Sequence, residues 1–123
     1  MKKLLQIVLV SSLSLLCFSC YYDETIEEAV VEIPDTQVVS FASDIQTIFS
    51  KCTSCHGGSI NPDLREGNSY NALVPTYVTA GDADASRLYN YLPGNGHHDV
   101  SVTLSATEIA LVKAWINQGA NNN

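Results

Sequence analysis

The chain has little positive charge. Six lysines and arginines face thirteen acidic residues among 123, which gives a formal net charge of −7. This balance argues against a nucleic-acid-binding surface and against adhesion of the folded domain to anionic lipid, because both need clustered basic side chains. Methionine is nearly absent as well, since Met1 is the only one. No strong alternating apolar pattern and no internal repeat is present, so we expect neither a sheet nor a repeat architecture.

The longest apolar run is at the N-terminus, where Lys2-Lys3 is followed by apolar residues from Leu4 to Phe18. A basic start and a short apolar stretch predict a secretory signal, too short to span a membrane. Ser19 before Cys20 resembles a bacterial lipoprotein signal, which implies that residues 1–19 are removed and that Cys20 is lipidated. Cys17 stands where an aliphatic residue is usual, so the alternatives are a soluble exported protein cut nearby and an uncleaved anchor.

We expect residues 20–37 to consist of the lipidated Cys20 and a flexible tether. Residues 21–37 contain six acidic residues and few side chains that could form a core. From Cys20 onward, four basic residues remain against thirteen acids, a formal charge of −9. Residues 38–121 then form one small domain. A protein core alone is marginal at that size, so an apolar cofactor would be part of the fold.

Cysteine is also scarce, and two of the four cysteines lie in Cys52-Thr53-Ser54-Cys55-His56. This C-x-x-C-H spacing is the attachment sequence of c-type haem. The thiols of Cys52 and Cys55 can add to the two vinyl groups of one porphyrin, and His56 can supply the proximal imidazole ligand. The motif therefore predicts one covalent haem c, and no cysteine is left over for a disulfide.

Two other interpretations of the cysteines have less support in the sequence. A zinc site needs two more ligands at suitable spacing, but the other histidines, His97 and His98, are adjacent. A redox dithiol expects a strand-rich βαβ setting, whereas the segment before Cys52 predicts a helix. Haem is favoured over both.

Helical signals are strongest near the two ends of the domain. Ser40 is a suitable N-cap, and apolar residues recur at helical spacing from Phe41 to Cys52, which predicts a first helix that Gly57-Gly58 ends. A capping box of Ser105 and Glu108 begins a last helix that ends at Gly119. Its predicted apolar face consists of Ile109, Val112, Trp115 and Ile116, with Trp115 packed in the core against the first helix. Between them we expect a loop over 59–68, short helices over 70–74 and 83–92, and a turn over 93–96.

Three segments resemble a known family. Residues 44–57, 69–74 and 104–120 are similar to the patterns D-I-Q-x-I-F-x-x-x-C-x-x-C-H-G, S-Y-x-x-L-V and L-S-x-x-E-I-x-x-I-x-x-W-I-x-x-G-A of small class I-type cytochrome c domains. They resemble especially the bacterial lipoprotein and enzyme-appended forms. The resemblance implies an all-α cytochrome c fold in which the first and last helices cross and short helices surround one covalent haem.

The resemblance also implies a function. It indicates an electron carrier and not an enzyme, exported to the bacterial cell envelope and anchored by lipid, facing the periplasm or in the outer membrane. Its partners would be redox proteins of the envelope, and we expect a monomer. The alternative is a haem-based module that binds or senses gases and other small ligands.

The distal iron ligand is where this chain departs from the family, which usually supplies a methionine. Met1 leaves with the signal, so a thioether ligand is excluded in the mature chain. His97 and His98 lie in the corresponding loop, and an ungapped match at Leu104-Ser105 puts His98 on the methionine position. We therefore predict His98, with His97 as the alternate, because neighbouring side chains in an extended loop point opposite ways. The third possibility is that neither histidine binds the iron. The sixth coordination position would then be open to small ligands.

Residues around the haem are predicted from their chemistry. His56 is expected to donate its second ring N–H to a backbone carbonyl in the loop over 59–63, with Pro62 as the rigid support. Arg65 and Arg87 are the only arginines, and each is either a cationic partner of the haem propionates or a solvated charge.

Overall fold

The computed structural model describes residue 3 and residues 31–97 and 101–123. The predicted signal peptide, Cys20, most of the predicted tether and His98 lie outside the described residues. The helices, in order, are η2 (Phe41–Ile45), α2 (Gln46–Ser50), α3 (Ser69–Leu73), α4 (Arg87–Asn90) and α5 (Ala106–Asn117). Within the described ranges the only β-type pairings are two isolated bridges, Thr79 with Asp82 and Pro93 with His97. The predicted all-α class is therefore confirmed there. None of the described helices is long and apolar enough to cross a bilayer.

The first helix begins where the sequence predicts it. Ser40 is extended, and its side chain accepts a hydrogen bond from the backbone N–H of Ser43, while Asp44 accepts from the N–H of Ser40 at 2.8 Å. The opening turn, η2, is a π-helix, and α2 continues it without a break. The predicted end of this helix at Gly57-Gly58 is wrong: helical structure ends at Ser50, before the cysteines, and residues 51–59 form successive turns. The N–H groups of Lys51 and Cys52 bond to carbonyls three residues back, which replaces the α-helical pattern.

The last helix confirms its predicted boundaries. Ser105 accepts from the Glu108 N–H at 3.2 Å, and the Glu108 carboxylate accepts from the Ser105 N–H at 2.9 Å, so both halves of the capping box are formed. Helix α5 ends at Asn117, and Gly119 follows at φ 101°, a left-handed conformation that glycine adopts without strain.

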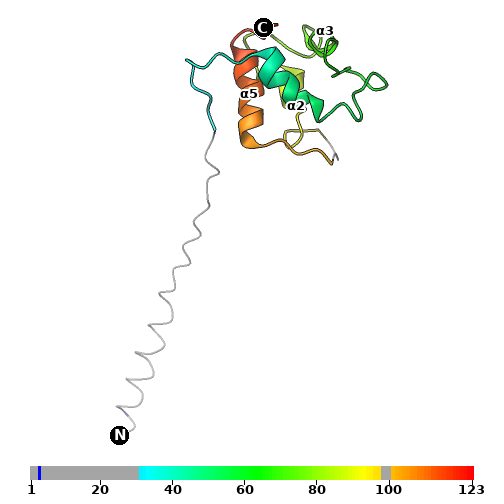
Figure 1. Ribbon diagram of the computed structural model, residues 1–123. Helices are drawn as coiled ribbons and strands as arrows, with labels where there is room; N and C mark the ends of the chain where they lie inside the picture. The colour runs from blue at the N-terminus through cyan, green and yellow to red at the C-terminus, as the bar shows by residue number, and fades with distance from the viewer. Residues whose placement is uncertain (1–2, 4–30, 98–100) are drawn as a thin grey trace.

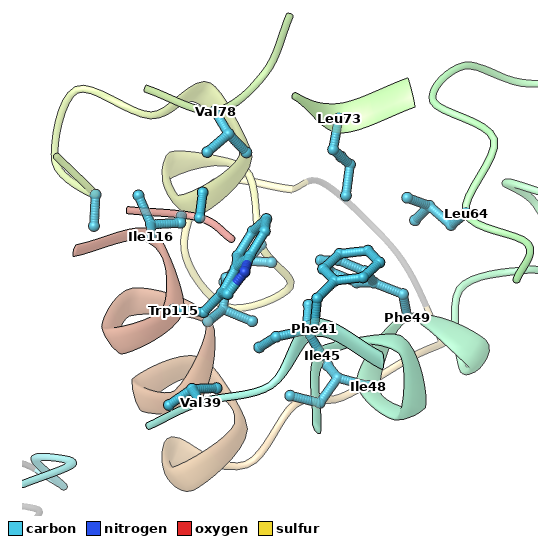
Figure 2. Packing of buried hydrophobic residues seen from close by; sticks show 14 residues of the cluster. Val39, Phe41, Ile45, Ile48, Phe49, Leu64, Leu73, Val78, Trp115 and Ile116 are labelled. Carbon is cyan, nitrogen blue, oxygen red and sulfur yellow. The ribbon is translucent and has the colours of Figure 1, made fainter. Parts of the chain in front are cut away.

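The core lies between these two helices. Trp115 is 1% exposed, and its ring centre is 5.2 Å from that of Phe41, which makes an edge-on contact with Tyr70 at the same distance. Figure 2 shows Trp115, Phe41 and Phe49 gathered between the two helical segments, and Figure 1 shows α5 beside η2 and α2. The indole N–H donates to the backbone carbonyl of Asn121 at 2.9 Å. The prediction that Trp115 is a core residue joining the first and last helices is confirmed.

The helix predicted over 83–92 is wrong at both ends, because only Arg87–Asn90 is helical. Asp82 accepts from the backbone N–H of Ala85 through its side chain, and the buried Ser86 hydroxyl donates to the carbonyl of Asp82 at 2.7 Å. These side-chain bonds to the backbone hold a turn in place of a helix. The helix predicted over 70–74 is found one residue earlier, and the predicted turn over 93–96 is present.

Contacts with the domain extend N-terminally beyond the expected boundary at residue 38. Ile33 packs against the core cluster. Gln118 at the end of α5 donates to the carbonyl of Gln37 at 2.8 Å and accepts from the N–H of Val39 at 2.9 Å. The packed part of the described chain therefore begins at Ile33, within the segment that composition assigned to the tether.

Candidate functional site

The segment that follows α2 forms a tight turn that is closed by local backbone hydrogen bonds. The carbonyl of Cys52 accepts from the N–H of Cys55 at 3.2 Å and from that of His56 at 2.9 Å. A Cβ atom on Gly57 would lie 2.6 Å from the carbonyl oxygen of Thr53, so only glycine fits after His56. Cys52 is half-buried and Cys55 is exposed, and neither forms a disulfide. Burial raises the pKa of the Cys52 thiol, and the nearby Lys51 opposes that shift.

His56 is oriented by the loop that follows. Its Nδ1 lies 3.1 Å from the carbonyl oxygen of Pro62, and the backbone N–H of Leu64 donates to the carbonyl of His56 at 2.8 Å. Because a carbonyl only accepts hydrogen bonds, Nδ1 donates in this contact, and Nε2 of that neutral tautomer has the lone pair that can bind a metal. The expected bond from His56 to a carbonyl in the loop over 59–63 is confirmed, at Pro62.

A cavity of about 370 Å³ opens beside this turn. Both cysteines, His56 and His97 line it, so residues from two segments that are distant in the sequence meet there. Its apolar lining includes Phe49, Leu64, Leu88, Leu92 and Val102. This volume is within the range of about 300–1,000 Å³ that is usual for cofactor pockets, and an apolar wall with a few polar groups is their usual composition.

The rings of His56 and His97 lie close together at this cavity, which both residues line. Their centres are 6.2 Å apart, and their planes meet at 81°. The turn over 93–96 positions His97: the carbonyl of Leu92 accepts from the N–H of Asn95 at 2.8 Å and from that of His97 at 3.4 Å. Gly96 has φ 120°, and a Cβ there would lie 2.5 Å from the carbonyl oxygen of Asn90, so the turn packs closely on the end of α4.

The two arginines have different surroundings. Arg87 lines the cavity, and its guanidinium lies 5.6 Å from the ring centre of Tyr77 and 5.4 Å from that of Tyr91. Arg65 is not among the lining residues, and it makes a two-point ion pair with Asp63 at 2.7 and 2.9 Å. Hydrogen bonds from Arg65 hold the pKa of the Asp63 carboxyl well below its usual range. The structure thus brings Arg87 to the candidate site and leaves Arg65 outside it.

A lysine amine can also bind haem iron. The two lysines of the domain, however, are paired with acidic side chains. Lys51 pairs with Glu108, and Lys113 lies 3.9 Å from Asp84. No group of three or more histidine, cysteine, aspartate or glutamate side chains that could hold a metal ion occurs in the described part of the chain.

Comparison of the chain with protein-family models, with curated proteins and with solved structures gives no match. The site must therefore be interpreted from the chemistry of its own residues.

Those residues fit a covalent porphyrin. Two thiols lie at the edge of an apolar cavity, and an imidazole with a free Nε2 lies beside them. The sequence identified Cys52, Cys55, His56 and Arg87, but it missed the tyrosines around Arg87. The spacing of Arg87 and Tyr91, four residues apart on one helical face, was a signal that could have found one of them.

Proposed function

We propose that the chain is a monohaem c-type cytochrome that carries single electrons in the bacterial cell envelope. One observation carries the proposal: the thiols of Cys52 and Cys55 and the oriented ring of His56 line one apolar cavity, which His97 also lines. A C-x-x-C-H sequence at such a cavity has the residues that covalent haem requires.

Each residue has a definite role in this proposal. Cys52 and Cys55 would hold the haem through thioether bonds, and His56 would be its proximal ligand. The bond from His56 to Pro62 fixes the tautomer and the ring orientation, and it raises the basicity of Nε2. A bound haem supplies a one-electron ferric/ferrous couple. The apolar lining excludes water around it, and Arg87 supplies positive charge for the propionates.

The same proposal covers fold and location. The packing of η2 against α5 through Trp115 supports a small class I-type cytochrome c fold. The leader and Cys20 support export and a lipid anchor, which would hold the domain in the envelope beside redox proteins that are its partners. We propose that the protein is an electron carrier and not an enzyme, because a single haem with two fixed axial ligands transfers electrons without binding a substrate at the iron.

The test is to express the full chain in bacteria that attach haem c, then to record spectra of the reduced protein with and without CO. We expect a low-spin haem spectrum that CO leaves unchanged and a redox titration that fits one electron. A Cys52→Ser/Cys55→Ser variant should lose the covalently bound colour on a denaturing gel. Rapid CO binding by the unaltered protein would favour the gas-binding alternative, and a colourless protein would refute the haem assignment itself.

A further inference from the structure

We infer that His97, and not His98, is the second axial ligand of the iron, with its ring nearly perpendicular to that of His56. This inference depends on the proposed function, since it assumes a haem at Cys52 and Cys55. The sequence match favoured His98, which lies outside the described residues. The geometry of the described residues points to His97.

The separation of the two rings fits a shared metal. An imidazole nitrogen lies about 2.0–2.1 Å from a bound transition metal and roughly 1.1 Å from its own ring centre, so two imidazoles on opposite sides of one metal have ring centres roughly 6.2–6.4 Å apart. The ring centres of His56 and His97 are 6.2 Å apart. Two imidazoles complete a six-coordinate iron when a porphyrin supplies the other four nitrogens.

The two histidines are positioned by different parts of the chain. Nδ1 of His56 is bonded to the carbonyl of Pro62, and the N–H of His97 is bonded to the carbonyl of Leu92 through a turn that closes on the end of α4. The two bonds lie on different segments of the chain, and the ring planes of the two histidines meet at 81°. We therefore expect the two rings to be crossed when both bind one iron.

Two consequences can be measured. An iron with an imidazole on each side has no open position, so it resists CO and stays low-spin in both oxidation states. Crossed imidazoles make the two in-plane directions of the ferric iron nearly equivalent. The frozen ferric protein should therefore give an electron paramagnetic resonance spectrum with one dominant low-field feature, whereas parallel rings give three well-separated lines.

The test compares His97→Ala with the matched neighbour variant His98→Ala, both in the full-length haem-loaded protein. His97→Ala should convert the ferric haem from low-spin to high-spin and let CO bind the reduced iron. Added imidazole should restore the low-spin spectrum, which shows that the variant remains folded. His98→Ala should leave the spin state, CO binding and resonance spectrum unchanged.

Several results would overturn the inference. If His98→Ala opens the iron and His97→Ala does not, the distal ligand is His98. If neither variant changes the spectrum, no histidine of this pair binds iron. A three-line resonance spectrum of the unaltered protein would refute the crossed arrangement. Each of these results requires covalent haem in the purified protein, measured first by mass, so a failure of the proposed function is detected separately.

Discussion

Around Trp115, side-chain packing and helix caps stabilise the domain, whereas around His56 and His97 the chain is held by backbone hydrogen bonds, turns and glycines. The first region is a cluster of nearly fully buried side chains that includes the indole. The second surrounds a cavity of about 370 Å³. The difference indicates that side-chain packing stabilises the helical half, while the loop half encloses the cavity in which the proposed haem would lie. Four predictions test this contrast, from the largest expected effect to the smallest.

Trp115→Ala should destabilise the domain by about 3–5 kcal/mol, because it removes the largest buried side chain and its contact with Phe41. Urea unfolding followed by circular dichroism measures the effect. Val38→Ala is the control, since Val38 is 76% exposed and should change stability by less than about 0.5 kcal/mol. A loss below 1 kcal/mol for Trp115→Ala would contradict the assignment of the core to this half.

Gly96→Ala should disturb the loop half at the position of His97. A Cβ there would meet the Asn90 carbonyl at 2.5 Å, in a conformation at φ 120° that other residues rarely adopt. We expect a loss of about 2–3 kcal/mol and partial opening of the iron to CO. Gly94→Ala is the matched control: it has a positive φ of 88° but nothing within 4 Å, so about 1 kcal/mol should be lost and CO should stay excluded. Equal effects from the two variants would show that close packing of this turn does not position His97.

Glu108→Gln should cost about 1 kcal/mol at neutral pH, because it weakens the capping box of α5 and the ion pair with Lys51. Hydrogen bonds from Lys51 and Ser105 lower the pKa of the Glu108 carboxyl. A carboxyl whose pKa is lowered by folding stabilises the protein above its unfolded pKa, and this contribution is lost as the pH falls through its folded pKa. Urea unfolding at several pH values should therefore show the difference between variant and parent shrinking below the usual glutamate pKa of about 4.3. A difference that stays constant into acid would contradict the role of the charge.

Arg87→Gln should lower the reduction potential of the haem by about 10–40 mV, because it removes a positive charge that lines the cavity and favours the ferrous state. Arg65→Gln should change the potential much less, since Arg65 lies outside the lining residues and is paired with Asp63. A redox titration of both variants measures the contrast. A larger shift from Arg65→Gln would reverse the assignment of the two arginines.

The sequence predicts the helical half of the fold well. The capping box, the apolar face of α5 and the burial of Trp115 follow from local rules, because periodicity and short-range hydrogen bonds determine them. The start of α4 did not follow, since the side chains of Asp82 and Ser86 compete with the helix for backbone groups.

The site could be predicted in part. The thiols and His56 are adjacent in sequence, so their grouping and the bond from His56 to Pro62 could be expected from the motif alone. The proximity of the His97 and His56 rings could not be predicted, because the two residues are forty-one positions apart in the sequence. It depends on a turn that folds back onto α4, and hydrophobic periodicity does not predict such a turn. The different surroundings of Arg65 and Arg87 likewise come from tertiary contacts.

The most direct test of the account is the mass of one tryptic peptide. Trypsin cleaves after Lys51 and Arg65, so residues 52–65 form a single peptide that contains both cysteines and His56. In protein from bacteria that attach haem c, this peptide should have the added mass of one haem, and iodoacetamide should alkylate neither cysteine. A peptide without that mass, with both cysteines alkylated, would contradict the central claim.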